Sequence, residues 1–277
     1  MKHFVDTSIA RPLLLGTREY KRYFRSVLGA EPLYASTYVQ MELERSYLLN
    51  VISFYFTLLL PTMHTLDDAI RLWTNQYAGS KLKAVLQLVA ELAATHRLES
   101  NAKGKAQCLQ VLSLYIKRID LKIRRTFLDP SNDSTRCGRA TVKLKVDSAN
   151  PADGLRRFVD QFGDVDACRG RCRIDYTLLK RHRTSVERYV QIAHGLAENE
   201  ETRGFLRITD TLRDILDRGG SACSCRTCEK VGDAVVALET PRMMNLEHTD
   251  RSFNHLCPPI EQPHSQHPSE TAVVSST

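Results

Sequence analysis

The chain has 277 residues, of which 42 % are hydrophobic and 26 % are charged, and its formal net charge is +7. This composition is typical of a globular chain long enough for one large domain, or for a domain that carries an insertion. The sequence contains no secretion signal, no apolar run of membrane-spanning length, no Gly-rich phosphate loop and no GxSxG elbow. Its eight cysteines are too sparse for a disulfide scaffold. We therefore expect a cytoplasmic protein, and we disfavour membrane proteins, P-loop proteins and serine hydrolases.

The first sixty residues predict alternating strands and helices. Residues 3–5 form a short apolar strand that leads directly to Asp6, and a basic helical segment follows from Arg18 to Arg25. Residues 33–35 predict a second strand, and the next helix carries Glu42 in its first turns. This order of strand, helix, strand and helix predicts an α/β fold with a parallel sheet.

Residues 61–220 predict a mostly helical insertion. Thr65 and Asp68 have the spacing of a capping box, and apolar residues then recur at helical spacing between residues 82 and 92 and between residues 109 and 123. Two further helices are predicted over residues 175–199 and 203–218. Within this region, the alternation of apolar and polar residues over 142–147 predicts a short strand.

The α/β pattern resumes near the end of the chain. Residues 233–238 predict a short buried helix that begins at Asp233, and residues 245–249 predict a strand that ends at Asp250. The last twenty residues hold four of the ten prolines and little apolar content, so residues 258–277 are predicted to be a disordered tail. The predicted domains are therefore a core in two parts and the segments around it, listed by range: 1–60 (core, first part), 61–220 (insertion), 221–257 (cysteine cluster and core, second part) and 258–277 (tail).

Four acids stand at the expected strand ends and helix starts: Asp6, Glu42, Asp233 and Asp250. In an open parallel sheet, ligands bind in the crevice at the carboxyl ends of the strands, so these acids are expected to converge. Converging carboxylates need a counter-charge, and oxygen ligands suit Mg²⁺ or Mn²⁺. One or two such ions can generate hydroxide from water and stabilise in-line attack on phosphate. The local alternatives are a helix N-cap for Asp233 and a surface pair with Arg45 for Glu42.

The four acids and their surroundings resemble the motifs of PIN-domain ribonucleases, in the same order along the chain. The resemblance covers about a quarter of the chain, over residues 3–50 and 230–257, and its motifs are Phe4-Val5-Asp6-Thr7-Ser8, Ser36-Thr37-Tyr38-Val39-Gln40-Met41-Glu42-Leu43, Gly232-Asp233-Ala234-Val235-Val236-Ala237 and His248-Thr249-Asp250-Arg251-Ser252-Phe253. It implies a PIN-like α/β/α three-layer fold and metal-dependent endonucleolytic cleavage of RNA. Asp6, Glu42, Asp233 and Asp250 would be the metal-binding acids, supported by Thr7 or Ser8. The 190 positions between Glu42 and Asp233 are a departure from compact members of that family.

Cysteine spacing predicts a structural zinc site next to the third motif. Cys168 and Cys172 form one short pair, and Cys225 and Cys228 form another about fifty residues later, with Cys223 as an alternative to Cys225. Two short pairs separated by a helical segment suit tetrahedral Zn²⁺. Free thiols or a redox dithiol are the alternatives. A zinc ion here would fix the chain just ahead of Asp233.

Basic residues predict a nucleic-acid partner. Between Arg97 and Val146 there are twelve Lys and Arg residues and only four Asp and Glu residues. Arg118, Lys122 and Arg125 share a helix face, and Arg169 and Arg171 flank the first cysteine pair, so these five side chains are predicted to contact phosphates. A solvated helix face is the alternative, and it is also the predicted state of a mixed-charge segment containing Arg203, Arg207, Asp210, Arg213, Asp214, Asp217 and Arg218.

The function predicted from the sequence is a Mg²⁺- or Mn²⁺-dependent nuclease, specifically an endoribonuclease in which a metal-activated water attacks phosphorus. An alternative from another class is a zinc-stabilised nucleic-acid-binding or adaptor protein without catalytic activity. A metal-dependent phosphatase acting on small molecules is a third possibility. The residues predict neither the oligomeric state nor a sequence preference for the RNA.

Overall fold

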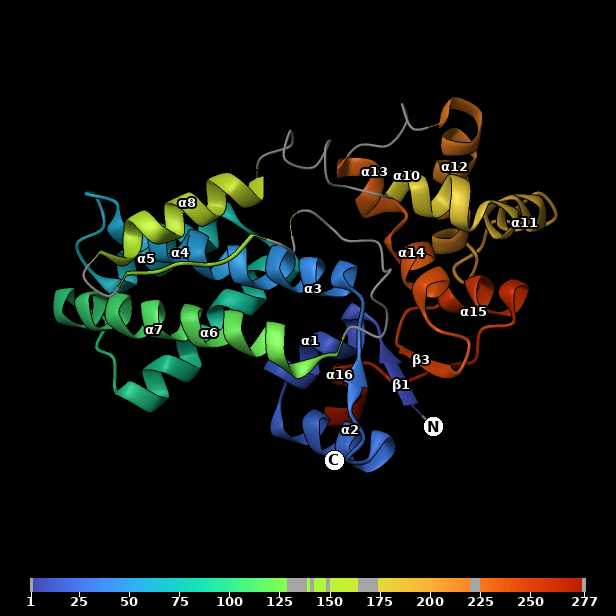
Figure 1. Ribbon diagram of the computed structural model, residues 1–277. Helices are drawn as coiled ribbons and strands as arrows, with labels where there is room; N and C mark the ends of the chain where they lie inside the picture. The colour runs from blue at the N-terminus through green and yellow to red at the C-terminus, as the bar shows by residue number, and fades with distance from the viewer. Residues whose placement is uncertain are drawn as a thin grey trace. The chain divides into compact units, whose positions relative to one another are not determined.

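The computed structural model describes residues 2–128, 139, 142–147, 150–163, 174–219 and 225–275 (Figure 1). Within these residues the chain is mixed α/β and mostly helical, with a small sheet of four parallel strands. Packing divides the chain into two compact units, Met1–Met41 with Arg125–Thr141 and Asp164–Thr277, and Glu42–Arg124 with Val142–Gly163. These units divide the chain at positions other than 60 and 220, the boundaries expected from the sequence.

The first unit contains the sheet and its surrounding helices. Its strands are β1 (Lys2–Val5), β2 (Leu33–Tyr34), β3 (Met244–His248) and β4 (His264–Gln266). Its helices are α1 (Thr7–Leu15), α2 (Arg18–Leu28), α3 (Thr37–Leu43, of which the last two residues belong to the other unit), α10 (Ile174–Tyr176), η3 (Thr177–Arg181), α11 (Arg183–Ala193), α12 (Arg203–Arg218), α13 (Cys225–Lys230), α14 (Gly232–Glu239), α15 (Phe253–Leu256), η5 (Pro258–Ile260) and α16 (Glu270–Ser275).

The sheet brings the two ends of the chain together. Its strand order is β2-β1-β3-β4, and every neighbouring pair is parallel. Val5 in β1 pairs with Glu247 in β3, and the backbone N–H of Asp6 donates to the carbonyl of Glu247 at 3.0 Å, so the ladder continues to the end of β1. All five residues of β3 are buried, as expected for a strand that pairs on both sides in a parallel sheet. The predicted parallel α/β core is therefore confirmed at the level of the sheet.

The end of the chain corrects the prediction of a disordered tail over 258–277. Residues 264–266 form β4, which adds a fourth strand beside β3, and α16 packs on α2. The His267 N–H donates to the His248 carbonyl at 2.7 Å, and the Gln262 side chain donates to the Met244 carbonyl at 2.8 Å. Composition misses this strand because backbone and polar side-chain hydrogen bonds hold it, rather than an apolar pattern.

A buried carboxylate joins two strands of the sheet and the segment that follows a third. Glu247 is only 2 % exposed, and its two oxygens lie 2.6 Å from Nδ1 of His3 and 2.6 Å from Nε2 of His267. The amide of Asn245 donates to the same carboxylate at 2.7 Å. Burial by itself raises the pKa of Glu247, but the hydrogen bonds from His267, Asn245 and His3 together lower it below its usual value. This network links β1, β3 and the segment after β4.

The start of α14 is positioned by Tyr38 from α3. Gly232 is the first residue of α14, and the Tyr38 hydroxyl donates to the carbonyl of Cys228 at 2.9 Å. A Cβ atom on Gly232 would lie 2.8 Å from both Cε1 and Cζ of the Tyr38 ring and closer still to its hydroxyl. Tyr38 belongs to the second sequence motif and Gly232 to the third, so these two motifs are in contact. Only glycine fits at position 232.

Gly232→Ala is expected to destabilise the protein by about 1–3 kcal/mol, the usual cost of overpacking a close-packed site. Tyr38 is 1 % exposed, so its ring cannot move aside into solvent. Urea denaturation measures the loss. Gly195→Ala is the matched control, since a Cβ atom there would meet only the Ile192 carbonyl oxygen at 3.8 Å. Equal stability of Gly232→Ala and the wild type would contradict this packing.

The second unit is helical in its described residues. It contains η1 (Glu44–Leu48), α4 (Leu49–Leu59), α5 (Leu66–Gln76), α6 (Gly79–His96), α7 (Ala102–Thr126, apart from its last two residues) and α8 (Pro151–Gly163). The capping box of Thr65 and Asp68 at the start of α5 is confirmed. Glu44, which is fully buried, pairs with Arg124 at 2.9 Å, and Arg124 also donates to Asp120 at 3.1 Å. This buried ion network holds α7 against η1.

The strand predicted over 142–147 is wrong, because these described residues form neither strand nor helix. The Val142 carbonyl accepts a hydrogen bond from Arg124 at 2.6 Å, so a side chain occupies a group that a strand would offer to a neighbour. Alternating polarity alone cannot supply a pairing partner. In the part of the chain that the structure describes, no helix is both long and apolar enough to cross a membrane.

Candidate functional site

Asp6 lies at the carboxyl end of β1 and caps α1. Its backbone is extended, with φ −79° and ψ 167°, and its Oδ2 accepts a hydrogen bond from the Ser8 N–H at 3.0 Å. These are the features of an Asp N-cap. The side chain is buried, with only 4 % of the residue exposed. The predicted position of this acid at the rim of the sheet is therefore confirmed.

Asp250 lies two residues beyond β3, the strand that neighbours β1, and it is exposed. The charge of Asp250 affects the pKa of Asp6. Burial is the main cause that raises the pKa of Asp6, hydrogen bonds from Ser8 and Thr7 oppose this rise, and repulsion from Asp250 adds to it. The sheet thus brings together two carboxylates from opposite ends of the chain.

Two serines tie the acids to neighbouring elements. The Ser8 hydroxyl accepts from the Thr249 N–H at 3.0 Å, which joins the start of α1 to the end of β3. The Ser252 N–H donates to Asp250 at 2.9 Å, and the Ser252 hydroxyl donates to Asp233 at 2.6 Å. Asp233, in the first turn of α14, is therefore linked to Asp250 through one side chain. Ser252 is a site residue that the sequence did not predict. An Asp often accepts a hydrogen bond from the backbone N–H two residues later, so Asp250 signals this turn, but nothing local signals the contact between the Ser252 hydroxyl and Asp233.

Glu42 belongs to the second packing unit, unlike the other three acids. One of its oxygens lies 4.0 Å from a guanidinium nitrogen of Arg45, the partner that the local alternative predicted, although the Glu42 side chain is only 19 % exposed and is not a solvated surface group. The structure therefore links Asp6, Asp250 and Asp233 at one end of the sheet. That Glu42 joins them stays a prediction.

The carboxylates fit a divalent cation in part. The described residues contain no group of three or more His, Cys, Asp or Glu side chains arranged to hold a metal ion. Asp6, however, is a buried acid that is repelled by a second acid, and the groups that favour its ionised form are hydrogen-bond donors at Ser8 and Thr7 rather than cations. A cation at the ends of β1 and β3 would offset both the burial and the repulsion.

Most of the predicted zinc ligands lie outside the described residues. These are Cys168, Cys172 and Cys223, together with the side chain of Cys225, whose backbone begins α13. Cys228, in the same helix, is buried and is not in a disulfide. Burial raises the pKa of the Cys108 and Cys257 thiols to about 12, so neither is a reactive thiolate. The zinc site stays a prediction.

Of the five side chains predicted to contact nucleic acid, two lie outside the described residues and three lie within them. Arg169 and Arg171 lie outside the described residues, whereas Arg118, Lys122 and Arg125 are exposed on α7. Exposure suits a phosphate contact and a solvated helix face equally well. Phosphate binding by these three side chains therefore stays a prediction.

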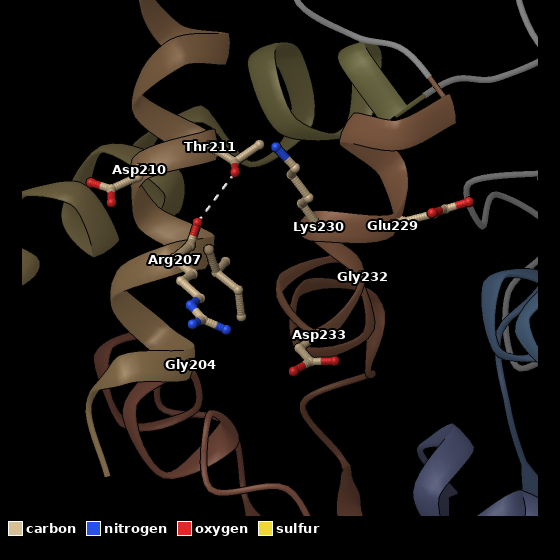
Figure 2. Close-up of a pocket in the computed structure, with 9 residues that line it drawn as sticks. Gly204, Arg207, Asp210, Thr211, Glu229, Lys230, Gly232 and Asp233 are labelled. Carbon is tan, nitrogen blue, oxygen red and sulfur yellow. Dashed lines mark hydrogen bonds between the residues drawn. The ribbon is translucent and has the colours of Figure 1, made fainter. Parts of the chain in front are cut away.

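A pocket of about 490 Å³ lies beside Asp233, between α12 and the α13–α14 segment (Figure 2). Its lining includes Arg207 and Lys230, which point into this space, as well as Asp233 at one end. From the sequence, Arg207 was expected on a solvated helix face. Helical periodicity finds the exposed side of α12, but it cannot find the second helix that turns this side into a pocket wall.

The chain was compared with protein-family models, with curated proteins and with solved structures. None of the three comparisons finds a match.

Proposed function

We propose that this chain is a divalent-cation-dependent nuclease, specifically an endoribonuclease, with a PIN-like three-layer α/β/α core. One observation carries the proposal: Asp6 and Asp250 follow neighbouring parallel strands and repel each other at the carboxyl end of the sheet. The crevice at this end is where open α/β sheets bind their ligands. A buried acid with a like-charged neighbour is costly to a fold, so a binding role accounts for it better than a structural one.

Asp6, Asp250 and Asp233 would hold Mg²⁺ or Mn²⁺, with Glu42 as a fourth ligand. A bound ion of this kind lowers the pKa of water and stabilises charge on a phosphate. The protein's own part is to orient the acids. The Ser8 N–H fixes Asp6, and Ser252 fixes both Asp250 and Asp233 through two hydrogen bonds. The predicted zinc at Cys168, Cys172, Cys225 and Cys228 would steady the segment just ahead of Asp233.

The test is cleavage of end-labelled single-stranded RNA by the full chain, with Mg²⁺ or Mn²⁺ and with EDTA. Cleavage should require the metal ion, and Asp250→Asn should lower its rate by about 10²-fold, as expected when one preorganised electrostatic group is removed. Asp250 is exposed, so this variant should fold normally. Asp214→Asn is the control, because Asp214 forms an exposed pair with Arg218 on α12.

Cleavage that survives EDTA, or equal cleavage rates for Asp250→Asn and the wild type, would overturn the proposal of a metal-dependent nuclease at this site. RNA binding without cleavage under every metal condition would support the zinc-stabilised binding or adaptor protein instead. Elemental analysis of the purified chain measures zinc separately. The same preparations tested on a phosphomonoester distinguish a nuclease from a phosphatase.

A further inference from the structure

We infer that the pocket between α12 and the α13–α14 segment binds a phosphate group of the substrate, next to the carboxylates. The ligand's identity as nucleic acid rests on the proposed function, whereas the anion site rests on the pocket itself. The site is built from Arg207 on one wall and Lys230 on the other, with Asp233 at its end.

The charges that face this pocket are mainly positive. Among the described residues, neither Arg207 nor Lys230 forms an ion pair, and both side chains are directed into the pocket (Figure 2). The two other acids of the lining, Asp210 and Glu229, point away from it in the same view, and Asp210 lies 3.4 Å from Arg213 on the outer side of α12. The pocket is therefore faced by two positively charged side chains, one on each wall, and by one negatively charged side chain, Asp233.

The shape of the pocket suits a phosphate with part of a nucleotide attached. Arg207 offers the planar donor fork that matches phosphate oxygens, and Lys230 adds a compact charge from the opposite side. A volume of about 490 Å³ lies within the range of small-molecule sites and exceeds what a lone phosphate fills.

Asp233 connects the pocket to the carboxylates. It lines the pocket, and through Ser252 it is linked to Asp250. A substrate held by the pocket and by the carboxylates at once needs one phosphate for each. The substrate class is therefore an oligonucleotide backbone rather than a small molecule with one phosphate.

The experiment measures binding without cleavage. Fluorescence anisotropy in EDTA follows a twelve-nucleotide single-stranded RNA labelled at its 3′ end, prepared with a 5′-phosphate or a 5′-hydroxyl. Arg207→Gln and Lys230→Gln should each weaken binding about tenfold, the usual effect of losing one charge-assisted hydrogen bond. The slope of log K against log[salt] should become shallower by about 0.7 in each variant. Arg213→Gln, on the outer side of the same helix, should bind like the wild type.

The outcomes separate the pocket from the nuclease. Equal losses for the two RNAs support a pocket for an internal phosphate, and loss of a preference for the 5′-phosphate supports a pocket for the terminal one. Unchanged affinity and salt slope in both variants would overturn the inference, even where metal-dependent cleavage is found. Weaker binding in both variants, with no cleavage by the wild type, would retain the pocket and reject the nuclease. Arg207 and Lys230 are exposed, so thermal unfolding should match the wild type.

Discussion

Asp6→Asn is expected to lower metal-dependent RNA cleavage by about 10³-fold and, at the same time, to raise the Tm of the protein. The loss of cleavage follows because the amide cannot replace the carboxylate as a charged ligand. The gain in stability follows because ionised Asp6 is buried and is repelled by Asp250. Asn is as good an N-cap as Asp, so α1 keeps its first hydrogen bond.

The gain in Tm should depend on pH. The pKa of Asp6 is raised in the folded protein above its unfolded value of 3.8. Below pH 3.8 the carboxyl is protonated in both states, so it does not destabilise the folded protein. As the pH rises from 3.8 through the raised folded pKa, ionisation favours the unfolded state and the folded protein loses stability. The difference in Tm between Asp6→Asn and the wild type should therefore be small near pH 3.5 and largest at neutral pH and above. Thermal unfolding from pH 3.5 to pH 8 measures it.

Mn²⁺ supplies a further readout for the same variant. A ligand that binds only the folded state raises the Tm, so Mn²⁺ should stabilise the wild type and have a much smaller effect on Asp6→Asn. Asp214→Asn serves as the control in all three measurements. Retained cleavage in Asp6→Asn would end the nuclease proposal. A lower Tm at neutral pH would instead contradict the electrostatic account of Asp6.

Glu247→Ala is expected to cost about 3–5 kcal/mol of unfolding free energy, because each buried hydrogen-bond donor left unsatisfied costs about 1–3 kcal/mol. The substitution leaves His3, His267 and Asn245 without their shared acceptor and opens a cavity within the sheet. Glu247→Gln keeps the shape and should cost less. Urea denaturation at pH 7 measures both, with Glu261→Ala at an exposed position as the control. A loss below about 1 kcal/mol would mean that the network does not stabilise the sheet.

The pH dependence of the Glu247 contribution has the opposite sign to that of Asp6. The pKa of Glu247 is lowered in the folded protein, so its contribution is present above the unfolded value of 4.5. It is lost as the pH falls through the lowered folded pKa. The destabilisation caused by Glu247→Ala should therefore shrink in acid, whereas the stabilisation caused by Asp6→Asn should grow toward neutral pH.

Positions that depend on local sequence signals could be predicted. The apolar runs before Asp6 and Asp250 form β1 and β3, as expected, and α14 begins at Gly232, one residue before the predicted start at Asp233. Helix α12 begins and ends at the predicted residues, Arg203 and Arg218. These elements follow from short-range hydrophobic pattern and capping chemistry, which a single sequence displays directly.

Features that depend on partners far apart in sequence could not be predicted. Strand β4 is made of His264, Ser265 and Gln266, which carry no apolar pattern, and only its pairing with β3 makes it a strand. The acceptor for His3 is 244 residues away, so neither residue signals the other. The pocket has the same origin, because Arg207 and Lys230 line one space only after α12 and α13 have packed together.

Strand β4 also bears on aggregation. Without the last twenty residues, β3 would become the edge of the sheet, with five buried residues and a row of unsatisfied backbone groups that could template pairing between molecules. On this side of the sheet the edge is instead the three-residue polar strand β4, and short, polar edge strands disfavour such pairing. A segment that composition alone would mark as dispensable therefore covers the side of β3 that would otherwise be an open edge.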